Sequence, residues 1–178
     1  MRGTYTIIVE SKSDGYRVFG RLGRAKLRRG KYLYTGSAMG SGATSLERRL
    51  QRHGASSKTL RWHIDYLTSR PRCTVSGAVY VVSNKRLECS ANLCISEELK
   101  LHPVLPKIGA SDCNCDGHLL GPELHLSKMT LLKRLVNVYC RLARSDPSSR
   151  QVVQIDCASS HLFWNASRKI LIRPWFFV

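Results

Sequence analysis

Apolar residues in the first third of the chain follow the patterns of short β-strands. Residues 5–9 are β-branched or aromatic, and residues 16–19 alternate polar and apolar side chains. Residues 32–35 form a third short run, after a turn at Gly30. These runs predict an antiparallel meander, with a positively charged hairpin over residues 16–29.

Later segments show helical spacing. Ser45 is a suitable cap for a helix in which Leu46 and Leu50 form one apolar stripe and Gly54 ends the pattern. Similar spacing predicts helices at 58–68, 86–99 and 127–144, and residues 75–82 predict a central strand. Two further strands are predicted over residues 151–157 and 169–178.

The order of these elements predicts an α+β fold. A chain of 178 residues with 43% apolar residues suits one compact domain, with or without a small appendage. Gly121-Pro122 is the strongest boundary signal. We therefore expect a domain over residues 1–120, followed by a small basic αββ extension over 121–178.

The charge indicates which partners the chain has. Lys and Arg number 29 against 12 Asp and Glu, for a formal net charge of +17. Nucleic acid is the leading partner, because each neutralised phosphate releases counterions. An anionic membrane surface is the competing interpretation, but no basic amphipathic helix has a clean apolar face.

The cellular compartment is inferred from what the sequence lacks. The first residues have no long apolar core of a secretory signal, and no apolar run is long enough to span a bilayer. Seven cysteines is an odd number, without the spacing of a disulfide scaffold. We expect a reducing, cytoplasmic location.

Residues with chemical potential occur in a definite order. Gly3-Thr4-Tyr5 opens one strand, Tyr34-Thr35-Gly36 closes another, and a basic helix follows. That helix carries Arg48, Arg49, Arg52 and His53, and a lone acid, Glu88, comes later. Two phenols, a guanidinium and a carboxylate are suited to cutting a phosphodiester.

In this order the segments resemble the GIY-YIG nuclease superfamily. The resemblance is closest to its archaeal-type branch of formerly unknown function, sometimes fused to endonuclease III-like proteins. It covers about the first 120 residues and rests on the two tyrosine segments and on residues 48–53, 62–67, 87–89 and 111–119.

The resemblance implies a small three-stranded antiparallel sheet flanked by helices. It also implies that Glu88 holds one Mg²⁺ or Mn²⁺ ion and that Arg49, followed by a leucine and then by His53, binds the scissile phosphate. Tyr5 and Tyr34 correspond to the two family tyrosines. The chain departs from the pattern in lacking the asparagine that usually closes the motif set, where the loop 112–118 stands instead.

Each of these residues also has a purely structural interpretation. Tyr5 and Tyr34 could be ordinary strand aromatics, and Glu88 could only complement a helix dipole. A phenol with a pKa of about 10 is a poor base unless cations such as Lys31 lower that pKa. His53 is a second candidate base or a phosphate donor.

Basic side chains beside these segments are candidates for contact with a nucleic-acid backbone. The alternatives are a solvated helix face and a charged sheet edge that prevents aggregation. The candidate nucleic-acid-binding residues are Arg24, Arg28, Arg29, Lys31, Arg48 and Arg52.

A second metal site is suggested by Cys113-x-Cys115-x-x-His118. His63 and Asp65 could add ligands for a structural zinc ion, although Cys-x-Cys is tighter than the usual zinc spacing. The alternative is a hydrogen-bonded turn that packs against the helix carrying His63 and Asp65.

The sequence therefore predicts a magnesium-dependent endonuclease, with DNA favoured over RNA and DNA repair or processing as its setting. The alternative is a nucleic-acid-binding module that keeps the fold without the chemistry. A third interpretation is a zinc-stabilised adaptor that binds protein through Trp175-Phe176-Phe177.

Overall fold

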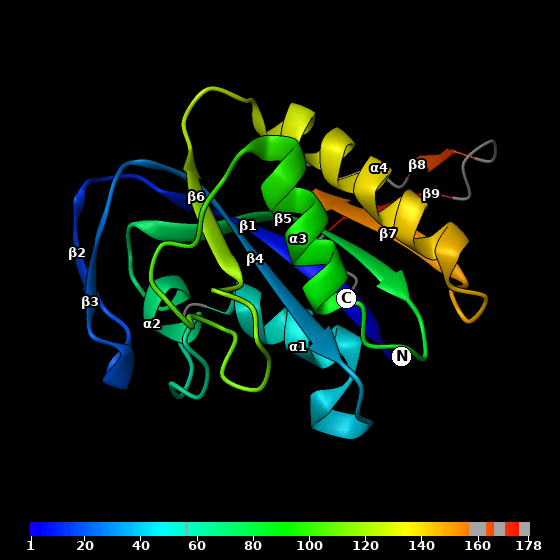
Figure 1. The fold of residues 1–178 in the computed structure, drawn as a ribbon, viewed down its shortest axis with the longest axis horizontal. Coiled ribbons are helices and arrows are strands. Elements are labelled where there is room, and N and C mark those ends of the chain that lie inside the picture. The colour runs from blue at the N-terminus through cyan, green and yellow to red at the C-terminus, as the bar shows by residue number, and fades with distance from the viewer. Residues whose placement is uncertain (56, 157–162, 166–169, 175–178) are drawn as a thin grey trace.

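One seven-stranded sheet runs through the molecule, with helices on both faces (Figure 1). The computed structural model describes residues 1–55, 57–156, 163–165 and 170–174. The strands are β1 Gly3–Ser11, β2 Gly15–Val18, β3 Arg24–Leu27, β4 Gly30–Ala38, β5 Cys73–Val82, β6 Leu119–Glu123, β7 Gln151–Asp156, β8 Phe163–Asn165 and β9 Ile170–Pro174. The α-helices are α1 Leu46–Gly54, α2 Asp65–Thr68, α3 Glu88–Leu99 and α4 Lys128–Ser145, and short 3₁₀ turns cover Gly20–Leu22 and Gly42–Thr44.

The expected α+β class is confirmed, but the sheet is larger than the three strands that were predicted. β1 pairs antiparallel with β4 and β5, and β6 joins β4 as a fourth antiparallel strand. β6 runs across Gly121-Pro122, where the sequence suggested a boundary. Beyond β5 the sheet continues through β7, β9 and β8, so that residues after 121 share the sheet with the first strands.

Alternation along β1 divides the interior into two cores. Tyr5, Ile7 and Val9 face one side of the sheet, against α1 and α2. Ile8 faces the other side, against α3 and α4. The view in Figure 1 agrees, since α3 and α4 lie in front of the sheet and α1 and α2 behind it.

The threonines of the two tyrosine segments, Thr4 and Thr35, have buried polar partners. Thr4 Oγ1 accepts a hydrogen bond from the Leu87 amide, 3.0 Å away, and thereby ties β1 to the start of α3. Thr35 Oγ1 lies 2.9 Å from Thr6 Oγ1, which in turn lies 2.8 Å from the Tyr139 hydroxyl. Both threonines are fully buried, so these contacts satisfy hydroxyls that would otherwise be costly.

The extra hairpin is confirmed as β2 and β3, and it extends from one end of the central strands. Gly15 pairs with Leu27, and Val18 pairs with Arg24. Phe19 and Leu27 are fully buried in the core between the sheet and helices α1 and α2. The hairpin is therefore anchored by apolar contacts, although its basic side chains face solvent.

The helix predicted over residues 58–68 is wrong for most of its length, because only α2, Asp65–Thr68, is helical. The Asp65 carboxylate accepts hydrogen bonds from the amides of Arg61 and Trp62, both 2.9 Å away, and holds the preceding segment in a turn. Ile64 and Leu67 are buried as expected, but Leu60 is exposed.

The other predicted helices are confirmed within a residue or two at their ends. Ser45 caps α1, and Ser127 caps α4 through the Thr130 amide. Within the described residues, no helix is both long and apolar enough to cross a membrane. Residues 157, 169 and 175–178, including the proposed docking aromatics Trp175-Phe176-Phe177, lie outside the described residues.

Candidate active site

A polar cavity of about 640 Å³ lies at the end of the central strands where β4 leaves the sheet. Its walls include Tyr34 from β4, Arg49 from α1 and Glu88 from the first turn of α3. These three residues are 54 positions apart at most, and the fold brings them to one space from three separate elements. Three of the candidate residues named from the sequence therefore lie at one cavity.

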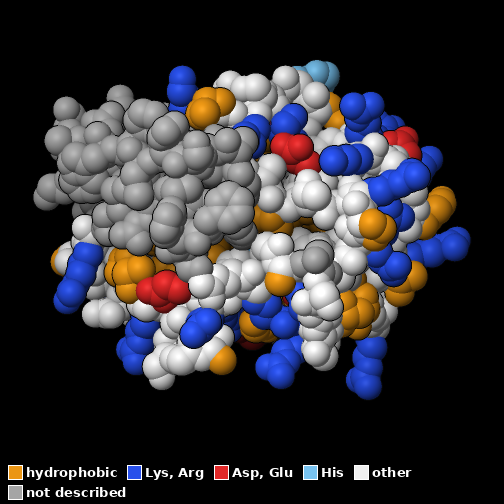
Figure 2. Space-filling model, turned by 180° about the vertical axis from the view of Figure 1, so that it is seen from behind, with side chains coloured by type: hydrophobic (Ala, Val, Ile, Leu, Met, Phe, Trp, Pro, Cys, Tyr) orange, Lys and Arg blue, Asp and Glu red, His pale blue; other side chains and the backbone are white. Residues whose placement is uncertain are grey.

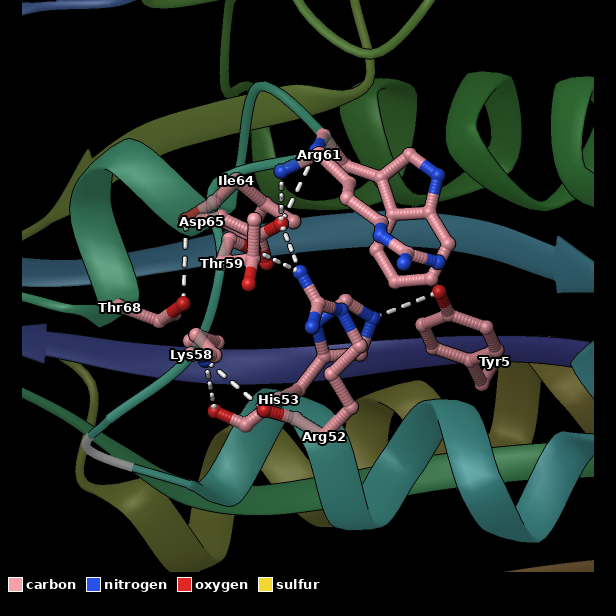
Figure 3. Close-up of polar contacts among 10 residues, drawn as sticks. Tyr5, Arg52, His53, Lys58, Thr59, Arg61, Ile64, Asp65 and Thr68 are labelled. Carbon is pink, nitrogen blue, oxygen red and sulfur yellow. Dashed lines mark hydrogen bonds and ion pairs between the residues drawn. The ribbon is translucent and has the colours of Figure 1, made fainter. Parts of the chain in front are cut away.

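Tyr5 and His53 form a buried pair behind the cavity wall. The Tyr5 hydroxyl lies 2.7 Å from His53 Nε2, and Figure 3 shows the phenol pointing at the imidazole ring. His53 is buried because it follows Leu46 and Leu50 at helical spacing, on the same face of α1. Its ring also packs edge-on against Tyr34, with centroids 5.9 Å apart.

Burial sets the protonation states of this aromatic group. It raises the pKa of Tyr5 well above its usual value, with Arg49 acting in the opposite direction. Burial also raises the pKa of Tyr34, and the neighbouring Tyr5 adds to the effect. For His53, burial lowers the pKa to about 3, helped by the charge of Lys58. At neutral pH both phenols are therefore protonated and the imidazole is neutral.

Glycines allow the close packing around both phenols. A Cβ on Gly36 would lie 2.7 Å from the Tyr5 hydroxyl oxygen. Gly109 has φ +70°, and a Cβ there would lie 2.7 Å from the Tyr34 ring. The loop that carries Gly109 is further fixed by a hydrogen bond from its amide to His63 Nδ1, 3.1 Å away.

Arg49 is held by stacking and not by an acidic partner. Its guanidinium lies 4.7 Å from the centroid of the Trp62 ring, and its Nε is buried without a hydrogen-bond partner. None of the ion pairs found among the described residues includes Arg49. The planar donor fork therefore borders the cavity without a competing carboxylate.

Arg52, four residues from Arg48 on the same helix, has a different role from the one expected. Its Nη2 lies 2.6 Å from the buried Asp65 carboxylate and also donates to the Thr59 carbonyl (Figure 3). Burial acts to raise the pKa of Asp65, but the amides of Trp62 and Arg61, together with Arg52, lower it overall. The guanidinium of Arg52 thus joins α1 to the turn that places Trp62.

Glu88 faces the cavity and is paired with an arginine. Arg86 Nη2 lies 2.8 Å from Glu88 Oε1, and the same guanidinium bonds Asp112 and, through Nε, the Ser37 hydroxyl at 3.1 Å. Glu88 is only 4% exposed, so its charge requires a partner in the structure. Arg86 supplies that partner and links three walls of the cavity.

The hairpin does not lie beside the cavity, contrary to the proximity that the sequence suggested. It grows from the Gly30 end of β4, whereas the cavity begins at Tyr34, about 13 Å further along the strand. Arg24, Arg28 and Arg29 are exposed there. Figure 2 views the molecule from behind relative to Figure 1. On the described part of that face Lys and Arg side chains are widely spread, and several of them lie at the end that carries β2 and β3.

The two remaining candidate cations have different surroundings. Lys31 is partly buried in β4, opposite Glu123 of β6. Arg48 is exposed on α1, and its Nη1 lies 3.3 Å from the Gln51 side chain. Neither residue lines the cavity among the described residues.

A second group of possible metal ligands lies next to the cavity. Cys113, Cys115 and His118 gather as the sequence suggested, and Cys89 of α3 completes the group. The ligand atoms of these four residues all lie within 4.8 Å of one another. His63 and Asp65, which the sequence offered as further ligands, are instead engaged with Gly109 and Arg52.

Sequence reasoning missed three residues that shape the site: Trp62, Arg86 and Cys89. Arg86 lies two positions before Glu88, and Cys89 directly follows it, so their neighbourhood was a usable signal. Trp62 lies in the segment 62–67 that supports the resemblance, but its place beneath Arg49 could not be read from that segment, because it depends on the turn that Asp65 imposes. Its ring lies under both Arg49 and Arg52.

The fold and the cavity define an α+β domain with a polar site lined by tyrosine, arginine and glutamate at the end of its central strands. A family model described as a domain of unknown function, DUF123, matches residues 4–143, and the chain belongs to this family. Comparisons with curated proteins and with solved structures gave no match.

Proposed function

We propose that this protein is a metal-dependent endonuclease of the GIY-YIG type that hydrolyses phosphodiester bonds in nucleic acid. DNA is the preferred substrate in this proposal, and repair or processing of DNA is the setting. The observation that carries the proposal is the meeting of Tyr34, Arg49 and Glu88 at one cavity, with Tyr5 and His53 directly behind it. The net charge of +17 supports a polyanionic substrate.

Arg49 is the residue proposed to bind the scissile phosphate. Its fork is preorganised on Trp62 and has no carboxylate to displace among the described residues. A guanidinium offers two parallel donors to two phosphate oxygens, which both orients the phosphate and offsets charge as it develops. The cavity volume, about 640 Å³, is sufficient for a nucleotide-sized group.

The tyrosines are proposed to act as protonated phenols. Because burial raises the pKa of Tyr34, its hydroxyl positions the attacking water by hydrogen bonding and is not itself the base. Tyr5 is hydrogen-bonded to a neutral His53, whose Nε2 accepts the hydrogen bond from the phenol when that nitrogen carries no hydrogen. Because burial lowers the pKa of His53 and raises that of Tyr5, the proton stays on the phenol, and the pair fixes the Tyr5 hydroxyl behind the cavity wall.

Glu88 is the residue proposed to hold a divalent metal. A carboxylate with Ser37 and Asp112 on the same cavity supplies the hard oxygen donors that Mg²⁺ prefers, so the residues present fit that ion. Mg²⁺ or Mn²⁺, when bound, would supply Lewis-acid stabilisation of phosphate oxygens. Arg86 would then keep its bond to Asp112 and give up its contact with Glu88 Oε1.

A cleavage panel tests this proposal. Labelled single- and double-stranded DNA and RNA are incubated with the protein, with and without Mg²⁺, and with Glu88→Ala and Glu97→Ala. Glu97 lies on the same helix but is exposed, which makes it a matched control. We expect product only when metal is present. The cleavage rate should fall by at least about 100-fold in Glu88→Ala and should be unchanged in Glu97→Ala. Equal cleavage by Glu88→Ala and wild type would refute the assignment.

A nucleic-acid-binding module without catalysis is the second candidate. The Arg86–Glu88 ion pair favours it, because the guanidinium occupies a carboxylate oxygen that a metal would need. The same panel separates the two candidates. Retarded mobility with a steep dependence on salt, and no product with Mg²⁺ or Mn²⁺, would identify the binding module.

A further inference from the structure

Three cysteines and one histidine from distant segments form a compact group beside the cavity. Cys89 lies in the first turn of α3, Cys113 and Cys115 lie in the loop after it, and His118 precedes β6. The structure records Cys89, Cys113 and Cys115 as free cysteines. All four ligand atoms lie within 4.8 Å of one another, and Cys113 Sγ lies 3.6 Å from His118 Nε2.

These separations match one tetrahedral ion. Bonds of about 2.3 Å from zinc to sulfur and about 2.0 Å to nitrogen place neighbouring ligands of a tetrahedron about 3.5–3.8 Å apart. The Cys113–His118 separation already has this value. The remaining pairs need to close by about 1 Å at most, given the 4.8 Å limit, which side-chain rotation can supply.

The donor types select the ion. Three thiolates and an imidazole are soft or borderline ligands, which bind zinc well and magnesium poorly. The compact arrangement suits one metal ion better than an iron–sulfur cluster, which spreads its ligands over two or more irons. Four protein ligands leave no open position for water, as in structural zinc sites.

The surroundings suit the charge that such a site carries. Zinc with three thiolates has a net charge of −1, and each thiol loses its proton to solvent on binding. Lys107 Nζ donates hydrogen bonds to the carbonyls of Cys113 and Cys115, at 3.3 and 3.0 Å. This ammonium group therefore lies close to the sulfur ligands. His118 is fully buried, so its ring is held in place by packing.

We propose that Cys89, Cys113, Cys115 and His118 bind one structural zinc ion that joins the start of α3 to the loop of residues 100–118. The same loop carries Gly109 and Asp112, and Cys89 directly follows Glu88. The ion would therefore hold two walls of the cavity together without contacting substrate. This site does not depend on the proposed nuclease activity, because its ligands are separate from the cavity residues.

Metal analysis of the full-length protein tests the site. Protein stripped with a chelator under reducing conditions is mixed with Zn²⁺ alone or Co²⁺ alone and passed through a desalting column. We expect about one ion per chain and a cobalt spectrum with the d–d bands of tetrahedral thiolate ligation. Zinc is also expected to raise the Tm of the stripped protein by about 10 °C.

Single variants locate the ligands. Cys89→Ser and Cys113→Ser should each lose most of the zinc, whereas Cys94→Ser, further along the same helix, should retain it. If the ligand variants do not fold, the cobalt spectrum and the Tm shift of the wild type still decide the matter. A wild type that keeps less than about 0.2 zinc per chain, carries a Cys113–Cys115 disulfide instead, or binds iron would overturn the proposal. Equal zinc loss in Cys94→Ser would overturn the ligand assignment.

Discussion

At the residue scale, the site depends on how buried groups are partnered. Arg49 has an aromatic support and no carboxylate, whereas Arg52, three residues later, is committed to Asp65. Both guanidiniums lie against the ring of Trp62, at 4.7 and 4.9 Å from its centroid. Of these two arginines on one helix, Arg49 therefore borders the cavity, whereas Arg52 positions the turn that carries Trp62.

Arg49→Lys tests the value of the planar fork. Lysine keeps the charge but loses the stacked geometry and the paired donors, so we expect kcat/KM for cleavage to fall by about 10- to 100-fold. Arg48→Lys, on the exposed side of the same helix, is the control and should change kcat/KM by less than about twofold. An Arg49→Lys variant that cleaves as well as wild type would show that charge alone is sufficient and that the planar fork is not needed.

His53 makes the stability of the fold sensitive to acid. Its pKa is about 3 in the folded protein and about 6.5 in an unfolded chain, so the unfolded chain binds a proton first as the pH falls. The contribution of neutral His53 to the free energy of unfolding is fully present above pH ~6.5 and is lost as the pH falls towards ~3. The free energy of unfolding should decrease by about 2 kcal/mol between pH 7 and pH 5.

Urea unfolding of wild type and His53→Gln at pH 7 and pH 5 measures this loss. The variant should be less stable at pH 7 and should show a smaller difference between the two pH values. His63 and His118, whose pKa values burial also lowers, are present in both proteins and cancel in the comparison. His102→Gln, on an exposed side chain, is the control. Parallel pH dependence in His53→Gln and wild type would contradict the assignment.

At the scale of elements, sequence patterns predicted those helices and strands that local interactions determine. β1, β4 and β5 follow from β-branched and aromatic runs, α1 follows from a serine cap and an apolar stripe, and α4 follows from its apolar stripe. The predicted helix over residues 58–68 failed because the Asp65 side chain competes for amides that a helix would otherwise use. A buried acid at that position has no signature in periodicity.

The contacts that could not be predicted from the sequence join segments that are distant along the chain. Tyr34, Arg49 and Glu88 were found because their short sequence segments occur in the order of a family that the sequence resembles. The contact of Cys89 with Cys113 and Cys115 depends on how the loop of residues 100–118 folds back on α3. The local spacing Cys-x-Cys-x-x-His gives no indication of the distant Cys89, so the fourth member of the group emerged only from the structure.

Gly109 links that loop to the cavity, and its substitution tests the contact. In Gly109→Ala a Cβ would lie 2.7 Å from the Tyr34 ring, at a backbone conformation that already disfavours side chains. We expect a loss of about 2–3 kcal/mol in the free energy of unfolding and at least about tenfold in cleavage rate.

Gly42→Ala is the matched control for the backbone alone. Gly42 has φ +55°, but nothing lies within 4 Å of its added Cβ. The control should therefore cost only about 1 kcal/mol, and its cleavage rate should stay within about twofold of wild type. Equal losses in the two variants, measured by urea unfolding and cleavage assays, would mean that the contact with Tyr34 is unimportant.

At the scale of the whole molecule, charge and site are separated along the central strands. The cavity lies at one end of β4, and the basic hairpin grows from the other. A substrate that touches both must span the length of the strand, as a nucleic-acid duplex can. The separation thus favours an extended polyanion over a small phosphate ester.

Salt dependence of binding tests the hairpin. Replacing Arg24, Arg28 and Arg29 with alanine should weaken DNA binding. It should also make the negative slope of log K against log salt less steep by up to about 2–3, since each phosphate contact contributes about 0.9 to that slope. Replacing Lys133, Arg144 and Arg150 removes the same charge from other surfaces and should leave the slope nearly unchanged. Identical slopes for the two triple variants would assign the effect to net charge.

The pairing of β7 with β5 has a consequence for any shortened form of this protein. The family match ends at residue 143. The edge of β5 that faces away from β1 is nevertheless paired with a later segment, since Gly77–Val82 bonds to Gln151–Asp156. A chain cut after residue 145 would leave the amides and carbonyls of that strand unpaired and open to the same strand of another molecule. Such a fragment should dimerise or aggregate on gel filtration to a greater extent than the 178-residue chain does.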